Sequence, residues 1–290
     1  MTVQETLDWA SAQLTDTTEA DLAARMLLAH VLDCSTTELF AHPERALTAD
    51  ETERYRQLVA RRADHEPVAY LVGHRAFFDI DLRVDRRALI PRPETEHLVE
   101  RAIDAARRWH SPRVVDVGTG SGAIAICVAM HIPRSHVYAI DRSQDALQLA
   151  QENARRHGVA DQITFLRGHL LDPLSAQVDL VVANLPYVSE PEYASLPPDI
   201  RLYEPREALV AGEDGLDAIR ALLDAAPPHL KQDGTLLLEI GATQRQAVVA
   251  LARQAFPGAR VTILPDYAGH DRAVQIELRW RADARKTHRL

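Results

Sequence analysis

From Arg113 onward, short apolar runs rich in valine and isoleucine alternate with longer stretches of helical length. Alternation at this spacing predicts an α/β domain built on a doubly wound parallel sheet with right-handed crossovers. We expect strands at residues 114–117, 137–140, 163–167, 178–183 and 235–240, and closing strands at residues 261–264 and 274–278. The helices between them should end at His131 and His157 and span residues 216–230 and 243–256.

The first 75 residues lack this alternation and look helical throughout. Ser/Thr-x-x-acid signals, which typically begin helices, occur at Thr2 with Glu5, Thr18 with Asp21, Ser35 with Glu38 and Thr48 with Glu51. Four starts predict four short helices, and no side chain among them points to catalysis. We interpret residues 1–75 as a small helical domain that docks a partner.

Residues 76–92 are expected to link the two domains as a β-hairpin. Apolar side chains alternate with polar ones at Phe78, Ile80, Leu82 and Val84, which is the period of a half-buried strand. Pro91 and Pro93 then stiffen the entry to the next helix. Residues 89–96 are therefore either a rigid helix entry or a wall of a substrate channel. The α/β domain would span residues 93–281, and a basic tail would follow at residues 282–290.

Charge and cysteine content exclude several classes of function. The formal net charge of −9 over 290 residues argues against broad binding to nucleic acid, because phosphate affinity needs a basic face. Cys34 and Cys127 match no metal-ligand spacing, and no HExxH pattern occurs. The first residues lack a signal-peptide pattern, and the longest apolar run, residues 123–130, is too short to cross a bilayer. We expect a cytoplasmic protein with no metal site and no membrane association.

A glycine-rich segment follows the first expected strand and opens a helix. Its glycines allow a sharp turn and close approach to a ligand, and the helix amino end favours negative or hydrogen-bonding groups. With Ala123 it also fits the dinucleotide pattern G-x-G-x-x-G/A, so the glycines alone do not separate NAD from another nucleoside cofactor. The crowded G-x-G-x-G with an acid two residues before it favours S-adenosylmethionine. The candidate cofactor-binding residues are Asp116, Gly118, Thr119, Gly120, Ser121 and Gly122.

Asp141 ends the second expected strand, 25 residues after Asp116. A carboxylate at that point can accept hydrogen bonds from both ribose hydroxyls of a nucleoside cofactor. By itself it could also cap the helix that begins near Ser143. The glycine-rich loop upstream favours the ribose contact.

The tetrapeptide Asn184-Leu185-Pro186-Tyr187 ends the strand expected at residues 178–183 and is our candidate reaction centre. An amide or exocyclic amino nitrogen is a poor nucleophile, because its lone pair is delocalised. The side-chain oxygen of Asn184 and the carbonyl of Leu185 could each accept one of its N–H bonds and aim the nitrogen at a methyl group. Tyr187 could stack on the planar group, and Pro186 favours an extended Leu185. All four residues are candidate catalytic and substrate-binding residues, and Asn184 would also contact the cofactor.

Over nearly its whole length the chain resembles the release factor glutamine methyltransferases, the HemK/PrmC family. The matching stretches are residues 66–70 with Gly73, 89–96, 116–125, 184–187, 204–206 with 208–209, 212–216, 238–241 and 266–272. The resemblance implies a Rossmann-like, seven-stranded methyltransferase domain, preceded by a small helical domain and a β-hairpin linker. It also implies S-adenosylmethionine-dependent methylation of the glutamine side-chain nitrogen (N5) in the Gly-Gly-Gln tripeptide of peptide chain release factors.

Two positions depart from the family pattern. The family usually has Asn-Pro-Pro-Tyr, whereas Leu185 stands at the second position here, and we expect its carbonyl to keep its role. After the third strand the family tends to carry an acid that meets the adenine amino group. His169 falls at that position, and Leu170 falls at the next one, which packs on adenine in the family.

Three other hypotheses stay open at this point. Asn-Leu-Pro-Tyr also resembles RNA adenine dimethylases, so an adenine-N6 methyltransferase acting on RNA or DNA is the first alternative. That enzyme would need a basic cleft and a base-flipping pocket. The second alternative is a glutamine methyltransferase acting on a ribosomal protein. The third is a catalytically silent, methyltransferase-like binding protein.

Overall fold

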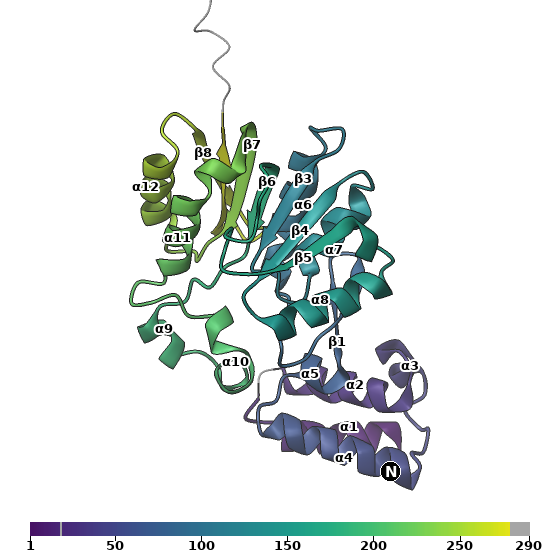
Figure 1. Cartoon of the computed structure of the whole chain (residues 1–290). Coiled ribbons are helices and arrows are strands. Elements are labelled where there is room, and N and C mark those ends of the chain that lie inside the picture. The colour runs from purple at the N-terminus through teal and green to yellow at the C-terminus, as the bar shows by residue number, and fades with distance from the viewer. Residues whose placement is uncertain (18, 279–290) are drawn as a thin grey trace, which may run out of the picture. The chain divides into compact units, whose positions relative to one another are not determined.

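The computed structural model describes residues 1–17 and 19–278, and these fall into two compact units (Figure 1). The first unit comprises Met1–His74, Val84–Arg86 and Leu196–Glu204. The second comprises Arg75–Arg83, Arg87–Ser195 and the described residues from Pro205 to Leu278. The basic tail predicted at residues 282–290 lies outside the described residues.

The first unit is built from short helices: α1 (Val3–Gln13), α2 (Ala20–Leu32), α3 (Thr36–Ala41), α4 (Ala49–Ala63), α5 (Val68–Val72) and α10 (Pro198–Tyr203). The predicted capping boxes at Thr2, Ser35 and Thr48 are all present. The fourth predicted start is wrong in position: α2 begins after Glu19, whose side chain makes no capping hydrogen bond, and Thr18 itself lies outside the described residues. Helix α5 was not predicted, because it has no capping side chain.

Buried side chains and a two-arginine brace hold the first unit together. Tyr55 is fully buried, and its hydroxyl donates to the carbonyl of Ala24 at 3.0 Å. The buried carboxylate of Glu66 accepts from Arg61 at 2.8 and 2.9 Å and from Arg86 at 3.1 Å. The bond from Arg61 is the main reason why the pKa of Glu66 is lowered. The family-like stretch at residues 66–70 therefore has a structural role in this unit.

A hairpin is present as predicted, but it lies earlier than residues 76–92: β1 (His74–Phe77) and β2 (Ile80–Arg83) form a two-stranded sheet. The alternating run is nevertheless not one strand, because the chain turns at Phe78, where φ is 55°. The end of the hairpin is tied to the second unit's own helix α8 (Gln144–Arg156). Asn153, fully buried on that helix, accepts from the Arg83 N–H at 2.8 Å and donates to the Arg83 carbonyl at 3.0 Å.

A seven-stranded sheet forms the centre of the second unit, in the order β5-β4-β3-β6-β7-β9-β8. Its strands are β3 (Arg113–Val117), β4 (His136–Asp141), β5 (Ile163–Arg167), β6 (Val178–Ala183), β7 (Leu230–Glu239), β8 (Arg260–Pro265) and β9 (Asp271–Glu277). The first five in this order run parallel, and β9 is antiparallel to both of its neighbours. The predicted α/β fold is therefore confirmed.

The remaining elements of this unit are α6 (Pro93–Ala106), α7 (Ala123–His131), α9 (Glu190–Ala194), α11 (Asp217–Ala225) and α12 (Arg245–Ala255). Short 3-10 turns occur at Ala160–Gln162, Arg206–Ala208 and Pro227–His229. The helix predicted for residues 216–230 is thus shorter, because Pro227 and Pro228 end it and β7 already begins at Leu230. Among residues 1–17 and 19–278, no helix is both long enough and apolar enough to span a membrane.

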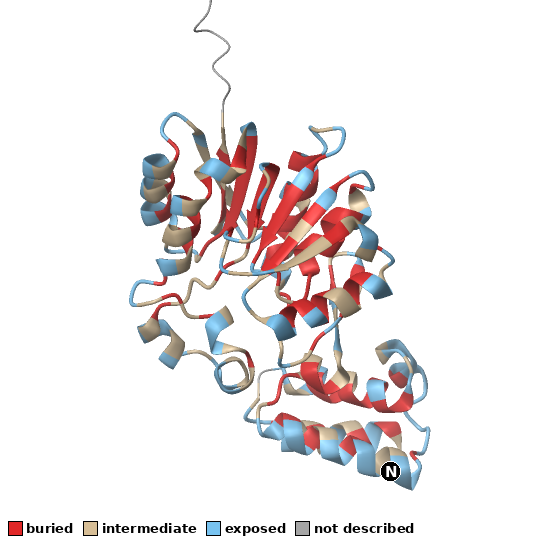
Figure 2. Ribbon diagram, in the orientation of Figure 1, coloured by how far each residue is buried: buried red, intermediate tan, exposed pale blue. Residues whose placement is uncertain are grey.

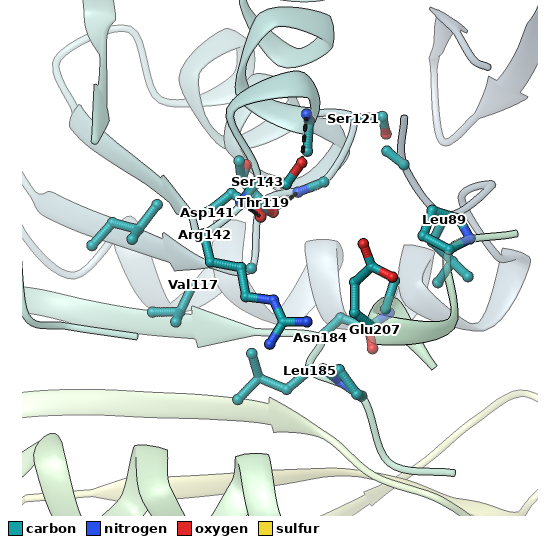
Figure 3. A pocket seen from close by; sticks show the side chains of 18 of the residues that line it. Leu89, Val117, Thr119, Ser121, Asp141, Arg142, Ser143, Asn184, Leu185 and Glu207 are labelled. Atoms are coloured by element: carbon teal, nitrogen blue, oxygen red, sulfur yellow. Dashed lines mark hydrogen bonds between the residues drawn. The ribbon is translucent and has the colours of Figure 1, made fainter. Parts of the chain in front are cut away.

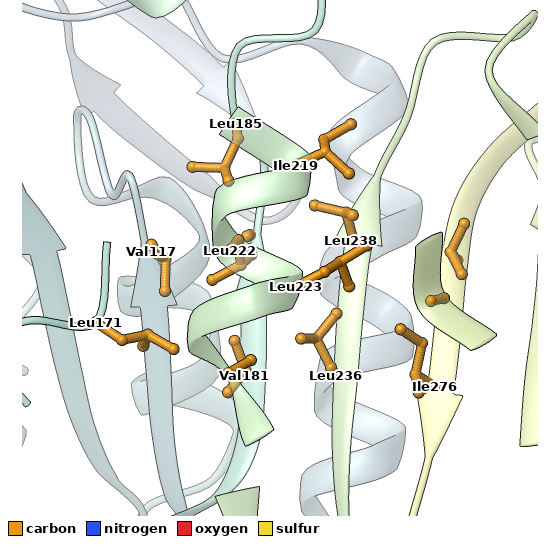
Figure 4. Packing of buried hydrophobic residues seen from close by; sticks show 14 of the residues in the cluster. Val117, Leu171, Val181, Leu185, Ile219, Leu222, Leu223, Leu236, Leu238 and Ile276 are labelled. Carbon is orange, nitrogen blue, oxygen red and sulfur yellow. The ribbon is translucent and has the colours of Figure 1, made fainter. Parts of the chain in front are cut away.

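Both faces of the central strands β3, β6 and β7 are buried over most of their length, as expected for parallel strands (Figure 2). Val117, Val181, Leu236 and Leu238 pack with side chains of α11 on one face (Figure 4). Since successive strand residues point to opposite faces, Glu239 points to the other face. Helix α6 covers that face at the end of β7, where its Thr95 bonds Glu239.

Candidate active site at the carboxyl edge of the sheet

A pocket opens where β3 and β6 end side by side (Figure 3). The parallel register of the two strands ends at the pair Val117 and Ala183, so Gly118 and Asn184 leave the sheet as neighbours. Because β4 and β6 lie on opposite sides of β3, this is the switch point at which open α/β sheets bind ligands. The pocket is open on one side, and its empty space, open solvent included, is about 1170 Å³.

The glycine-rich loop forms one wall of this pocket. The N–H groups of Gly118 and Thr119 donate to the carbonyl of Ile140 at 2.8 and 2.9 Å, which ties the loop to β4. Gly120 has a φ of 55°, and a Cβ built there would meet no atom closer than 3.9 Å. The backbone at Gly120 is therefore open to the pocket, as close approach of a ligand requires.

Asp141 lies at the end of β4, beside the same loop. One carboxylate oxygen accepts from the Gly120 N–H at 3.0 Å and the other from the Ser143 N–H at 2.9 Å. Ser143 itself caps α8, by accepting from the Ala146 N–H at 3.2 Å, so the alternative in which Asp141 caps that helix is wrong. A carboxylate has about four lone-pair sites, and the two that remain can serve a ligand with paired hydroxyls.

Asp116 supports the loop from behind and does not line the pocket. One of its oxygens accepts from the Thr119 hydroxyl at 2.6 Å and from the Ala125 N–H at 3.2 Å. Its other oxygen is buried and has no partner among the described residues. Burial raises the pKa of this carboxyl to about 7.

Asn184 is held by one half of its side-chain amide. Its Nδ2 donates to the hydroxyl of Thr95 at 2.9 Å. Within the described chain, no hydrogen bond reaches its Oδ1 or the carbonyl oxygen of Leu185. The sequence prediction assigned these two acceptors to the reacting nitrogen, and the structure leaves both of them available beside the pocket.

The side chain of Leu185 is buried, with 5% of its surface exposed. It belongs to the apolar cluster that contains Val117 and Ile219 (Figure 4). A Cβ added at Gly118 would lie 3.1 Å from its Cδ2, so the leucine packs closely on the glycine-rich loop. Packing holds this position, where the family usually has a proline ring.

Tyr187 lies behind the pocket and does not line it. Its hydroxyl donates to Glu239 at 3.4 Å, and its carbonyl accepts from Gln244 Nε2 at 2.9 Å. Burial raises the pKa of the Tyr187 phenol to about 12. At Gly215, with a φ of 72°, any Cβ would overlap the carbonyl oxygen of Tyr187. This close approach explains a glycine within the family-like stretch at residues 212–216.

His169 and Leu170 form the wall nearest to β5. Leu170 has a φ of 46°, in the left-handed region that costs a non-glycine residue about 1–3 kcal/mol. The next residue, Leu171, is fully buried and anchors this strained turn. Both positions that the resemblance associates with adenine therefore lie at the pocket.

Most of the predicted site residues are brought together here. Those that line the pocket are Gly118, Thr119, Gly120, Ser121, Asp141, Leu170, Asn184, Leu185 and Pro186. Asp116, Gly122 and Tyr187 do not line it, and their direct contact with a ligand stays a prediction. In the described part of the chain, no group of three or more His, Cys, Asp or Glu side chains is placed to hold a metal ion.

Several polar residues of the site were not singled out from the sequence, among them Thr95, Arg142 and Glu207. Figure 3 shows the guanidinium of Arg142 and the carboxylate of Glu207 beside Asn184 and Leu185. The two charged residues carry no motif of their own. Thr95 did have a signal, because it lies within the family-like stretch at residues 89–96.

Comparison with known proteins matches both the helical N-terminal part and the α/β part of this chain. The family model described as "PrmC N-terminal domain" matches residues 5–73, and "Methyltransferase small domain" matches residues 95–195. The release factor glutamine methyltransferase of Moorella thermoacetica is 44% identical over 252 residues, which is 87% of this chain and 89% of the relative. That of Bacillus anthracis is 36% identical over 284 residues, covering 96% of this chain and all of the relative.

Solved structures agree on the fold. The ribosomal protein L11 methylase of Lactobacillus delbrueckii subsp. bulgaricus matches with a TM-score of 0.51 and 23% identity, over 69% of this chain and 86% of that one. Identity at this level shows the methyltransferase fold alone. The near full-length match to curated relatives shows more, and the chain belongs to the release factor glutamine methyltransferase family.

Proposed function

We propose that this protein methylates the side-chain amide nitrogen of the glutamine in the Gly-Gly-Gln tripeptide of peptide chain release factors, using S-adenosylmethionine. The observation that carries the proposal is the pair of available acceptors, Asn184 Oδ1 and the Leu185 carbonyl, at the edge of the pocket. A primary amide has two N–H bonds, so two acceptors side by side match it. The family of this chain supports the choice of glutamine over an adenine amino group.

The pocket fits S-adenosylmethionine in three respects. The open backbone at Gly120 leaves room that a Cβ would fill. The unused lone pairs of Asp141 suit a ribose diol. The apolar side chains of Ile140 and Leu170 suit an adenine ring. We assign cofactor binding to these residues together with Gly118, Thr119, Ser121 and Asn184, and assign Asp116 and Gly122 to holding the loop.

When bound, the cofactor supplies an electrophilic methyl group on a sulfonium, and the chain's own residues prepare the nucleophile. Asn184 Oδ1 and the Leu185 carbonyl accept the two N–H bonds of the substrate amide, which orients its nitrogen. As positive charge develops on that nitrogen, both acceptors bind it more strongly, and this lowers the barrier. Pro186 and the packed side chain of Leu185 keep the two acceptors in place, so little reorganisation is needed during transfer.

The test uses radiolabelled S-adenosylmethionine with an unmodified release factor, and in parallel the same factor with its Gly-Gly-Gln glutamine replaced by alanine. We expect label on the first factor only. Label on RNA, DNA or a ribosomal protein, with none on the release factor, would replace this function by one of the alternative methyltransferases. Cofactor binding without label on any acceptor would favour a silent binding protein.

Two variants separate the two halves of the site. Asn184→Ala should lower kcat about 10²- to 10³-fold, as expected for losing one preorganised polar group at the reacting centre, with a smaller loss of cofactor affinity than in Asp141→Ala. Asp141→Ala should instead weaken cofactor binding, measured by calorimetry. Equal losses of cofactor affinity in both variants would contradict the roles assigned to Asn184 and Asp141.

The partners follow from the same proposal. The protein substrate is a release factor, and the helical unit that matches the PrmC N-terminal domain is proposed to dock it. The net charge of −9 supports a protein substrate over a nucleic acid. Because release factors act on the ribosome, we propose that this protein works in the cytoplasm.

A further inference from the structure

A chain of three hydrogen-bonding side chains runs from the reaction centre into the protein. Asn184 Nδ2 donates to Thr95 Oγ1 at 2.9 Å, and Thr95 Oγ1 donates to Glu239 Oε2 at 2.8 Å. The three residues come from the end of β6, the first turn of α6 and the end of β7. Thr95 is 4% exposed and Glu239 is 1% exposed, so water does not compete for these bonds.

The hydrogen-bonding protons of Asn184, Thr95 and Glu239 can be assigned one by one. An ionised carboxylate only accepts hydrogen bonds, and a threonine hydroxyl has one proton to donate. Thr95 gives that proton to Glu239, so it presents a lone pair to Asn184. Only the NH₂ half of the Asn184 amide can meet a lone pair, and the oxygen half is therefore directed away from Thr95.

The opposite arrangement of the amide is unfavourable. If Asn184 Oδ1 faced Thr95, the hydroxyl proton would have to turn toward it and away from Glu239. Among its hydrogen bonds to described residues, the buried carboxylate would then keep only the longer one from Tyr187, at 3.4 Å. A buried charged group that loses a hydrogen bond is left unsatisfied, which strongly favours one orientation of the amide.

We propose that Thr95 and Glu239 are positioning residues that select the orientation of the Asn184 amide, so that Oδ1 faces the methyl acceptor. The inference rests on the proposed function, because it explains how Asn184 presents an acceptor to an N–H bond. If the Asn184 amide were rotated, its NH₂ group would face the NH₂ group of the substrate amide, and the two donors would repel each other. Neither Thr95 nor Glu239 has to touch the substrate for this effect.

The kinetic test compares Thr95→Val with Thr95→Ser. Valine keeps the shape of threonine but has no hydroxyl, whereas serine keeps the hydroxyl and loses one methyl group. We expect Thr95→Val to lower kcat on an unmodified release factor at least tenfold, with KM and cofactor affinity changed by less than about threefold. Thr95→Ser should stay within about threefold of wild-type kcat. A merely structural role would lower the thermal midpoint of both variants without this split between kcat and KM.

If Thr95→Val turns over at the wild-type rate, the positioning role is wrong and the proposed function stands, since the wild-type protein still labels the release factor. If Thr95→Val and Thr95→Ser lose the same activity, the hydroxyl is not what matters. Both results differ from failure of the proposed function, which would show as no label with the wild-type protein.

A second measurement does not depend on activity. Neutron diffraction from a deuterium-exchanged crystal locates the exchangeable atoms directly. At alkaline pD we expect the Thr95 deuteron on the Glu239 side and two deuterons on the Asn184 atom that faces Thr95. A deuteron pointing from Thr95 to Asn184 would overturn the proposal even if the acceptor of the methyl group proved to be another molecule.

Discussion

Truncation of Leu185 to alanine tests whether packing replaces the proline ring usual at this position. The leucine side chain is 5% exposed, contacts the glycine-rich loop at Gly118, and shares an apolar cluster with Val117 and Ile219. Leu185→Ala leaves the backbone carbonyl in place. Any effect therefore comes from the lost packing.

The expected loss of stability follows from the atoms removed. Three carbon groups at about 0.8 kcal/mol each give roughly 2.4 kcal/mol for the transfer from water. A cavity would add to this value, but one side of Leu185 borders the open pocket and the loop can settle inward. We therefore expect a total of about 2–3 kcal/mol, at the low end of the range for buried leucines.

Native-state hydrogen exchange is the suitable assay, because it reports on the sheet of the second unit alone. Peptides from β3 and β6 should lose about 30- to 150-fold in protection, which corresponds to 2–3 kcal/mol at tenfold per 1.4 kcal/mol. The matched control is Met130→Ala on α7, where the side chain is 36% exposed and the cost should be much smaller. A loss of protection in Leu185→Ala no larger than in the control would refute the idea that packing holds this loop.

Three further predictions concern single groups. Gly215→Ala should lower the thermal midpoint at least twice as much as Gly269→Ala, since both glycines have positive φ but only the Cβ at Gly215 would overlap another atom, the Tyr187 carbonyl oxygen. The value of kcat should rise with pH through about 7, because burial raises the pKa of Glu239 to about 7 and only the ionised form holds Thr95 as a donor. Glu239→Gln should remove this rise of kcat with pH. The charged or titratable groups that act on Glu239 are Tyr187, Glu94 and Arg272. The free energy of unfolding should fall as pH rises from about 4 to about 7, because the folded state keeps the proton of Asp116, whose pKa is raised from 3.8 to about 7, while the unfolded chain has released it. Urea unfolding across this range should show that dependence weakened in Asp116→Asn, and a slope unchanged from wild type would contradict it.

Local signals were enough to predict much of the fold. Three of the four predicted helix starts in the first unit carry the complete capping box, because the two reciprocal bonds involve residues only three apart. The strands of the parallel sheet were also found from their apolar runs, since burial on both faces leaves a continuous signal. The predicted boundaries were wrong where the sequence signal was weak or absent, as at the start of α2 and at the turn of the hairpin at Phe78.

Some residues of the candidate site were likewise predicted from the sequence, and others were missed. Gly118, Gly120, Asp141 and Asn184 were predicted because each follows the end of an expected strand, and the carboxyl ends of parallel strands meet at one edge of the sheet. Arg142 and Glu207 were missed, although they line the same pocket. Arg142 follows the end of β4 and Glu207 lies in the 3-10 turn Arg206–Ala208, and no sequence pattern marked either side chain as part of a site.

The sequence by itself determined the class of fold, the family and the candidate tetrapeptide, because these depend on short motifs and on the order of segments along the chain. Only the tertiary structure decided how the tetrapeptide is held. Thr95 and Glu239 lie 89 and 55 residues from Asn184 along the chain; Thr95 bonds Asn184 and Glu239 bonds Thr95 because α6 covers the end of β7 beside β6. Hydrogen bonds between residues so far apart follow from packing and leave no local pattern, so the orientation of the Asn184 amide could be inferred only from the folded chain.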